Sequence, residues 1–169
     1  MRTLFKLARQ DLKRENVDLP EKLPLGAMIE VPAAAINVRA LLDHADFLAI
    51  GTNDLAQYVL AADRGNDALE NIYNPLQPAL LRLIAHVLSA GRRANKPVSL
   101  CGEIGGDVKF TALLLALGLH EYSMHPSQLL HVRDRLATLD HAELRRHAPR
   151  LIRSRTHEDA EALLAEITS

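Results

Sequence analysis

Short apolar runs alternate along this chain with longer stretches whose apolar residues have helical spacing. Four of the apolar runs each end in a small polar cluster, and a stretch with helical spacing follows each of them. The clusters are Ile29-Glu30-Val31-Pro32, Gly51-Thr52-Asn53-Asp54, Leu100-Cys101-Gly102-Glu103 and Ser123-Met124-His125-Pro126. Buried strands that alternate with helices are typical of an α/β protein with a parallel sheet. The pattern therefore predicts four βα units.

The boundaries of the elements follow from the same pattern. We expect strands over residues 25–31, 46–51, 97–101 and 121–124. Apolar residues at helical spacing predict helices over residues 3–15, 33–44, 53–63, 79–94 and 107–117. Residues 126–169 are expected to be helical with a break at Pro149, and Gly102, Gly105 and Gly106 are expected to form a loop. Asn53 or Asp54 is expected to cap the helix that follows the second strand.

The fold that fits four such units is half of a (β/α)8 TIM barrel, followed by carboxyl-terminal helices. In such barrels the chemistry sits at the carboxyl ends of the strands, where the four clusters lie. An open four-stranded parallel sheet is the alternative, and in either case we expect both faces of the sheet to be covered. We divide the chain into a barrel segment, residues 1–140, and a helical tail, residues 141–169.

Composition narrows the class of protein. The chain has 169 residues, 48% of them hydrophobic, and a formal net charge of −1, so no basic field favours nucleic acid. The single cysteine excludes an internal disulfide and fits a reducing compartment. No apolar run reaches the roughly 18 residues of a membrane span, and the first residues do not resemble a signal peptide. We expect a cytoplasmic protein that does not bind membranes.

Two carboxylates follow neighbouring strands. Glu30 ends the first strand and Asp54 follows the second, so both are expected at the same end of the sheet. Two carboxylate oxygens at that separation suit Mg²⁺, which completes its shell with substrate and water. The alternative for Glu30 is an ion pair with a Lys or Arg, and the alternative for Asp54 is helix capping.

A cysteine and an arginine complete the candidate chemistry. Cys101 ends the third strand, and a free thiol with an ordinary pKa near 8.5 stays protonated at neutral pH and can act as a general acid. A small buried hydrophobe is the alternative. Arg64 stands ten residues after Asp54 and is either a surface residue or a clamp for a phosphate or carboxylate.

Several motifs occur together in an order that points to one family. Ile29-Glu30-Val31-Pro32-Ala33-Ala34-Ala35 is followed by Ile50-Gly51-Thr52-Asn53-Asp54-Leu55-Ala56-Gln57-Tyr58 and by Ala62-Asp63-Arg64-Gly65-Asn66. Cys101-Gly102-Glu103, Gly106-Asp107 and Glu121-Tyr122-Ser123-Met124 come later. This combination, over residues 1–140, resembles the carboxyl-terminal domain of Enzyme I of the bacterial phosphotransferase system, phosphoenolpyruvate–protein phosphotransferase. Phosphoenolpyruvate synthase and pyruvate phosphate dikinase are more distant relatives.

The resemblance implies that this α/β chain is the second half of a TIM (β/α)8 barrel domain that binds phosphoenolpyruvate and Mg²⁺ and forms pyruvate. Mapped by motif, Glu30 and Asp54 would bind the metal, Asn53 and Arg64 would hold the phosphate, and Cys101 would protonate the methylene carbon. It also implies a homodimer, and a phosphocarrier protein of the HPr type as a partner reached through other domains.

The chain departs from the family pattern in three places. It contains no Thr-Ser-His segment that would accept the phosphoryl group, it lacks the arginines of the first barrel strands, and His125 follows Met124 where small residues are usual. We therefore expect the isolated chain to be inactive in phosphoryl transfer. Two other functions stay open: a non-catalytic module for dimerisation or interaction, and a relative that acts on another 2-oxo acid.

Overall fold

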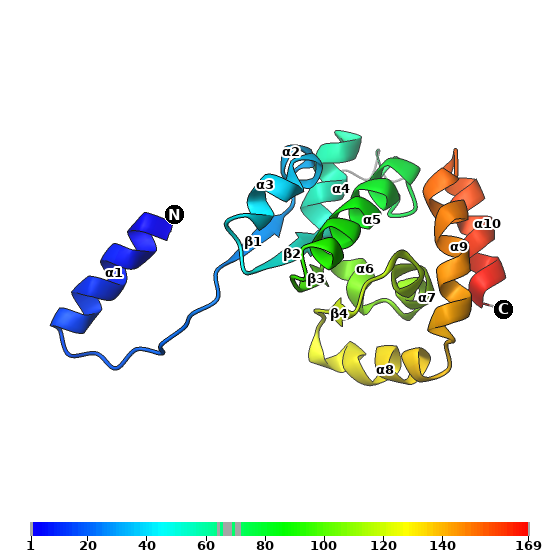
Figure 1. Ribbon diagram of the computed structural model, residues 1–169. Helices are drawn as coiled ribbons and strands as arrows, with labels where there is room; N and C mark the ends of the chain where they lie inside the picture. The colour runs from blue at the N-terminus through cyan, green and yellow to red at the C-terminus, as the bar shows by residue number, and fades with distance from the viewer. Residues whose placement is uncertain (1, 64, 66–68, 70–71, 169) are drawn as a thin grey trace.

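Four parallel strands form one sheet, in the same order as they occur along the chain. The computed structural model describes residues 2–63, 65, 69 and 72–168 (Figure 1). The strands are β1 (Gly26–Ile29), β2 (Phe47–Gly51), β3 (Val98–Cys101) and β4 (Glu121–Tyr122), in the order β1-β2-β3-β4. The predicted α/β class and all four predicted strands are confirmed, although β4 is shorter than expected.

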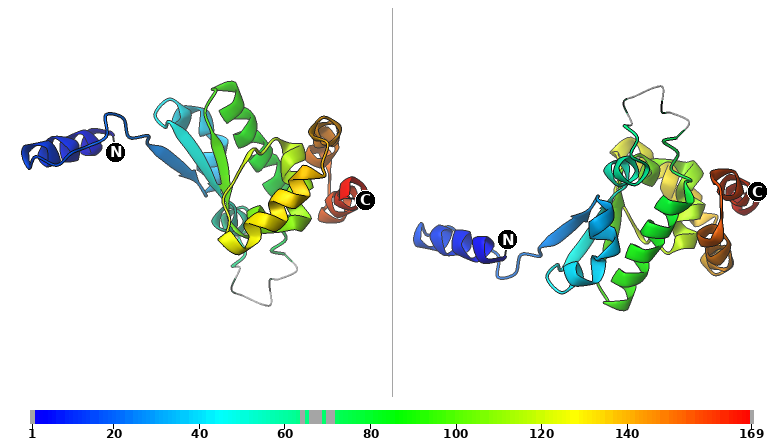
Figure 2. Two further views of the ribbon diagram at one scale, coloured as in Figure 1. Left: turned by 90° about the horizontal axis from the view of Figure 1, so that it is seen from below. Right: turned by 90° about the horizontal axis from the view of Figure 1, so that it is seen from above.

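The sequential strand order determines where the helices lie. In the described part of the chain, two α-helices connect each pair of consecutive strands. Between β1 and β2 lie α2 (Pro32–Ile36) and α3 (Val38–Leu42), and between β2 and β3 lie α4 (Thr52–Leu60) and α5 (Pro78–Arg93). Between β3 and β4 lie α6 (Glu103–Gly106) and α7 (Val108–Leu117). Every crossover moves in the same direction across the sheet, and right-handed crossovers of this kind place their helices on one face. Helix α5 packs there against β2 and β3 (Figure 2).

The register of the strands separates a buried face from an open one. Ile29, Ile50 and Leu100 form one row across β1, β2 and β3 and are completely buried beneath the helices. In the neighbouring row, on the opposite face, Met28 is 47% exposed. Phe47, at the amino-terminal end of β2 on that face, is 37% exposed. The prediction that both faces are covered is therefore wrong for the described part of the chain, because unidirectional crossovers leave one face without helices.

The carboxyl-terminal helices belong to the same hydrophobic core as the sheet. The 3-10 turn η2 (Pro126–Gln128) leads into α8 (Leu129–Ala137), which is followed by α9 (His141–Arg153) and α10 (His157–Thr168). Helices α8, α9 and α10 all pack against α7, which is buried over almost its whole length, and α9 also contacts α5. Leu144, Leu151 and Leu164 carry this packing into the core. The helical tail expected from the sequence is thus packed on the rest of the chain.

Helix α1 (Arg2–Arg14) lies apart from the other helices. Figures 1 and 2 show it at one end of the molecule, joined to β1 by an extended segment, while α9 and α10 lie at the other end. It has the predicted amphipathic character, yet none of its residues is buried. Its side-chain contacts with the sheet end come from Arg2, which donates to the carbonyl of His44 and pairs with Asp46.

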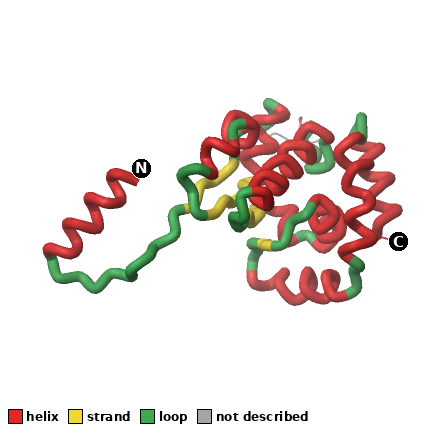
Figure 3. The backbone as a smooth tube through the Cα atoms, viewed as in Figure 1, coloured by secondary structure: helices red, strands yellow, loops and turns green. Residues whose placement is uncertain are grey.

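Three local predictions are wrong. Residues 33–44 form two short helices because Asn37 leaves the helical conformation, with φ −94° and ψ 26°. Residues 103–106 form the helical turn α6 instead of a loop (Figure 3). Pro149 lies inside α9, which continues through it although proline removes an N–H bond to the preceding turn and its ring crowds a carbonyl there.

The capping prediction is also wrong. The residue that caps α4 is Gly51, and no side chain makes a capping hydrogen bond there. Asn53 and Asp54 lie inside the first turn of α4, which leaves both side chains available for other contacts. Asp107 caps α7 by accepting a hydrogen bond from Lys109 N. Over the described ranges, every helix is too short or too polar to cross a lipid bilayer.

Candidate functional site

The residues singled out in the sequence gather at the carboxyl ends of β1, β2 and β3. Glu30 directly follows β1, Asn53 and Asp54 lie in the first turn of the helix after β2, and Cys101 is the last residue of β3. The strands are parallel and in register, so these ends form one edge of the sheet. Arg64 lies outside the described residues.

Glu30 reaches across the end of β2. A Cβ atom placed on Gly51 would lie 3.1 Å from Glu30 Cβ and 3.2 Å from Glu30 Oε2. The strand register pairs Gly51 with Cys101, so the carboxylate of Glu30 and the thiol of Cys101 flank the same glycine. The missing side chain at Gly51 gives the carboxylate this space on the open face of the sheet.

The thiol of Cys101 faces a partly apolar environment. Its Sγ lies 3.4 Å from the carbonyl oxygen of Ile50 and 3.8 Å from Met28 Sδ. Burial raises the pKa of Cys101 above its ordinary value, and the negative charge of Glu30 raises it further. The thiol is therefore protonated at neutral pH and can give a proton to a bound molecule.

Asn53 is held in a fixed orientation by Glu103. Its Oδ1 accepts a hydrogen bond from Glu103 N at 3.2 Å, and its Nδ2 donates to Glu103 Oε1 at 3.3 Å. The hydroxyl of Tyr73 donates to the carbonyl of Asn53 at 3.0 Å. Thr52 Oγ1 donates to the carbonyl of Cys101 at 3.2 Å, which ties the start of α4 to the end of β3.

Sequence reasoning gave no role to Glu103, Thr52 or Tyr73. Glu103 could have been found, because it follows the end of β3 at the same offset at which Asn53 follows the end of β2. Tyr73 gives no such signal, since it lies far from any strand end in the sequence and comes to Asn53 only through the fold.

The two acidic candidates differ in exposure and share a lack of partners. Glu30 is half-buried and Asp54 is exposed. Within the described residues neither carboxylate takes part in an ion pair or a side-chain hydrogen bond, so the alternative in which Glu30 pairs with Lys or Arg has no counterpart there. No group of three or more His, Cys, Asp or Glu side chains is placed to hold a metal ion in that part of the chain.

Comparison with known proteins shows the family to which this chain belongs. The family described as "PEP-utilising enzyme, PEP-binding domain" matches residues 1–141. The chain belongs to this family of phosphoenolpyruvate-utilising enzymes. The match covers all three strand ends described above.

Curated relatives confirm the resemblance to phosphoenolpyruvate–protein phosphotransferases. A protein of that name from Cupriavidus necator is 43% identical over 146 residues, which are 86% of this chain and 24% of that protein. One from Listeria monocytogenes is 38% identical over 94% of this chain and 28% of its own length. A multiphosphoryl transfer protein from Escherichia coli is 37% identical over 94% of this chain and 19% of its own length. The chain thus spans about a quarter of the length of these relatives.

Proposed function

We propose that this chain supplies the metal-binding and proton-donating part of a phosphoenolpyruvate site in a phosphoenolpyruvate–protein phosphotransferase. The observation that carries the proposal is the meeting of Glu30, Asn53 and Cys101 at one edge of the parallel sheet. The sequential strand order with helices on one face supports this proposal, because consecutive strands of a (β/α)8 barrel are neighbours and its helices lie outside. We further propose that the sheet forms the second half of such a barrel, with its open face turned to the interior.

Glu30 and Asp54 are the proposed ligands of Mg²⁺. Mg²⁺ is commonly held by one or two carboxylates plus substrate phosphate and water, and both side chains are free of other partners in the described residues. Glu30 is half-buried, and no described Lys or Arg makes an ion pair with its carboxylate, an arrangement that a metal ion would stabilise. When bound, the metal would neutralise negative charge on the substrate during transfer.

Asn53 and Cys101 act on the two ends of the substrate in this proposal. One N–H of the Asn53 amide is used by Glu103, and the second is available to a phosphate oxygen, with Arg64 as the second phosphate ligand. As the P–O bond breaks, the phosphoryl group passes to a histidine nitrogen and the enolate of pyruvate remains. Cys101 S–H gives its proton to the methylene carbon, and the resulting thiolate is reprotonated from solvent.

We propose that the acceptor histidine lies on another domain of a full-length phosphotransferase, and that the onward partner is a separate phosphocarrier protein. The names of the relatives support the transfer of a phosphoryl group from phosphoenolpyruvate to a protein. A phosphocarrier of the HPr type as the next acceptor is proposed from the family resemblance. A homodimer and a cytoplasmic location remain part of this proposal.

A second candidate function is a non-catalytic module for self-association. The half-exposed Met28 and Phe47 on the open face favour it, because exposed apolar surface on a sheet commonly marks an interface. Phosphoenolpyruvate synthases and pyruvate phosphate dikinases share the utilisation of phosphoenolpyruvate and are the alternative within the family.

Calorimetric titration of phosphoenolpyruvate into this chain tests the first proposal. We expect binding that requires Mg²⁺ and that is lost in Glu30→Gln, which keeps the shape of the side chain and removes its charge. Glu161→Gln, an exposed carboxylate on α10, is the matched control and should bind as the unchanged chain does. Binding of equal strength with and without Mg²⁺, or retained in Glu30→Gln, would contradict the proposed site.

A further inference from the structure

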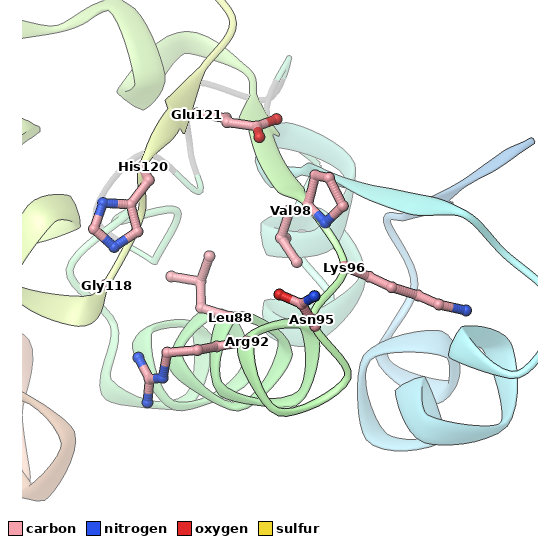
Figure 4. A pocket seen from close by; sticks show the side chains of 9 residues that line it. Leu88, Arg92, Asn95, Lys96, Val98, Gly118, His120 and Glu121 are labelled. Atoms are coloured by element: carbon pink, nitrogen blue, oxygen red, sulfur yellow. The ribbon is translucent and has the colours of Figure 1, made fainter. Parts of the chain in front are cut away.

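A second group of charged side chains lies at the opposite end of the sheet from Glu30 and Cys101. A cavity of about 280 Å³ opens there, beside the amino-terminal ends of β3 and β4 (Figure 4). Leu88, Pro97 and Val98 give it apolar walls, and Arg92 and His120 line it as well. None of these residues takes part in the site described above.

Two arginines from different helices meet at Gly118, which also lines this cavity. Arg92 comes from the last turn of α5 and Arg145 from α9. A Cβ atom on Gly118 would lie 3.1 Å from Arg92 Nη1 and 2.7 Å from Arg145 Nη1. Gly118 has φ +100°, a conformation that favours glycine, and its missing side chain lets both guanidinium groups approach the same backbone position.

No acidic side chain of the described residues neutralises this pair of arginines. In the residues that the structure describes, neither Arg92 nor Arg145 makes an ion pair or a side-chain hydrogen bond. Glu121 also lines the cavity, but Figure 4 shows its carboxylate turned away from Arg92 and His120. Like charges held close together repel, so this arrangement favours an anion between them.

His120 lies within the field of both arginines. Its ring meets that of His141 edge-to-face, with centroids 5.2 Å apart. Burial lowers the pKa of His120, and His141, Arg145 and Arg92 lower it further by charge repulsion. The imidazole is thus neutral at neutral pH and can form hydrogen bonds. Its pKa responds to the charges placed around it.

We propose that this cavity binds a small phosphate monoester. Its phosphate would lie beside Gly118, between Arg92, which lines the cavity, and Arg145, which reaches Gly118 from α9 and is not one of the lining residues. The planar guanidinium group suits bidentate contact with phosphate oxygens. Its carbon atoms would lie against Leu88 and Val98. The volume is just below the range of about 300–1,000 Å³ typical of drug-sized ligands, which favours a molecule with few carbon atoms. This site is independent of Mg²⁺ and of the proposed phosphoenolpyruvate site.

Nuclear magnetic resonance of the His120 imidazole tests the proposal directly. Inorganic phosphate and glycerol 3-phosphate are titrated into the chain without Mg²⁺, and the His120 signal is assigned with a His120→Gln variant. We expect a saturable shift of the signal and a rise in the pKa of His120, because a bound anion offsets the two positive charges. Glycerol 3-phosphate should bind more tightly than inorganic phosphate because it also reaches the apolar wall.

Matched variants separate a site from general charge effects. Arg92→Gln and Arg145→Gln should each weaken phosphate binding at least tenfold, whereas Arg93→Gln and Arg146→Gln, exposed neighbours on the same helices, should not change it. Glu30→Gln should also leave it unchanged, which distinguishes this site from the metal-dependent one. The proposal is overturned if chloride at equal ionic strength shifts His120 as phosphate does, or if all four arginine variants behave alike.

Discussion

Asn53 and Glu103 bind each other through two hydrogen bonds across the ends of β2 and β3. Glu103 N donates to Asn53 Oδ1 at 3.2 Å, and Asn53 Nδ2 donates to Glu103 Oε1 at 3.3 Å. One N–H of the amide is left, and its direction is determined by the two bonds already made. Glu103 is thereby a positioning residue for the proposed phosphate contact.

Replacement of Glu103 by alanine should weaken phosphoenolpyruvate binding without unfolding the chain. The variant removes one partly exposed hydrogen bond, worth about 0.5–1.5 kcal/mol, which corresponds to a loss of affinity of about 2- to 12-fold. The bond from the backbone N–H of residue 103 to Asn53 remains. Calorimetry with Mg²⁺ measures the affinity, and thermal melting checks the fold.

Glu103→Gln is the control for that experiment. Its side-chain oxygen can still accept the hydrogen bond from Asn53, so its affinity should lie close to that of the unchanged chain. If Glu103→Gln and Glu103→Ala weaken binding equally, the charge of Glu103 matters and its role in orienting Asn53 does not.

The charge of Glu30 should be measurable at Cys101. Burial first, and Glu30 second, raise the pKa of this thiol. Glu30→Gln removes one of the two causes, so the pKa should fall, the thiolate fraction at a mildly alkaline pH should rise and alkylation should become faster. Cys101 is the single cysteine in the sequence, so iodoacetamide labelling followed by mass spectrometry across a pH series reports on it alone.

Two results would contradict an effect of Glu30 on the pKa of Cys101. An unchanged alkylation profile in Glu30→Gln would mean that the carboxylate does not act on the thiol. A slower reaction would mean that the substitution buries Cys101 more deeply. Asp43→Asn, an exposed carboxylate in the segment between α3 and β2, serves as the control and should leave the profile unchanged.

Gly102 should tolerate no side chain. It has φ +125°, and a Cβ atom there would lie 2.1 Å from Thr52 Oγ1. Gly102→Ala therefore combines backbone strain with a clash against the residue that ties α4 to β3, and should lower the free energy of unfolding by about 1–3 kcal/mol. Gly65→Ala is the comparison, because a Cβ atom there meets Asp63 Oδ1 only at an ordinary 3.5 Å. Urea unfolding of both variants measures the difference, and equal stabilities would contradict the backbone described here.

Tyr122 should make the fold sensitive to alkali. Burial raises the pKa of Tyr122 well above its usual value, so the folded chain keeps the proton that the unfolded chain loses above about pH 10. The stabilisation is complete below that pH and is lost as the pH rises towards the pKa of the folded state, by up to about 1.4 kcal/mol per pH unit.

Tyr122→Phe should flatten this alkaline loss of stability. It removes the ionisable hydroxyl together with its weak bond to the carbonyl of Thr111 at 3.4 Å, so its cost at neutral pH should be small. Tyr58 is 58% exposed, and Tyr58→Phe should retain the loss. Urea unfolding at neutral and alkaline pH compares the variants, and a loss that persists in Tyr122→Phe would assign it to another group.

The sequence predicts the strands of this protein better than its helix ends. Strand positions depend on short buried runs, such as the one around Ile50, that only the interior of a sheet accommodates. The predicted helix ends were wrong where tertiary packing overrides the local preference of the sequence. Pro149 stays within α9 because Leu144 and Leu151, on either side of it, hold that helix against the core.

In the candidate site, too, the sequence predicts some features and not others. Glu30 and Cys101 could be placed from the sequence because strand ends of a parallel sheet share one edge. The contact of Tyr73 with Asn53, and the meeting of Arg92 with Arg145, join residues far apart in the sequence and on different elements. No local spacing marks such pairs, so only the fold brings them together.

The carboxyl-terminal helices should unfold together with the sheet. Leu151 of α9 is completely buried in the core that it shares with α5 and α7. Leu151→Ala should lower the free energy of unfolding by about 2–5 kcal/mol, whereas Ile152→Ala at the 36% exposed neighbouring position should change it by less than about 1 kcal/mol. Circular dichroism and hydrogen exchange at Ile50 should report a single unfolding transition in each of the two variants. Separate transitions, with β2 unaffected by Leu151→Ala, would mean that residues 141–169 fold as a unit of their own.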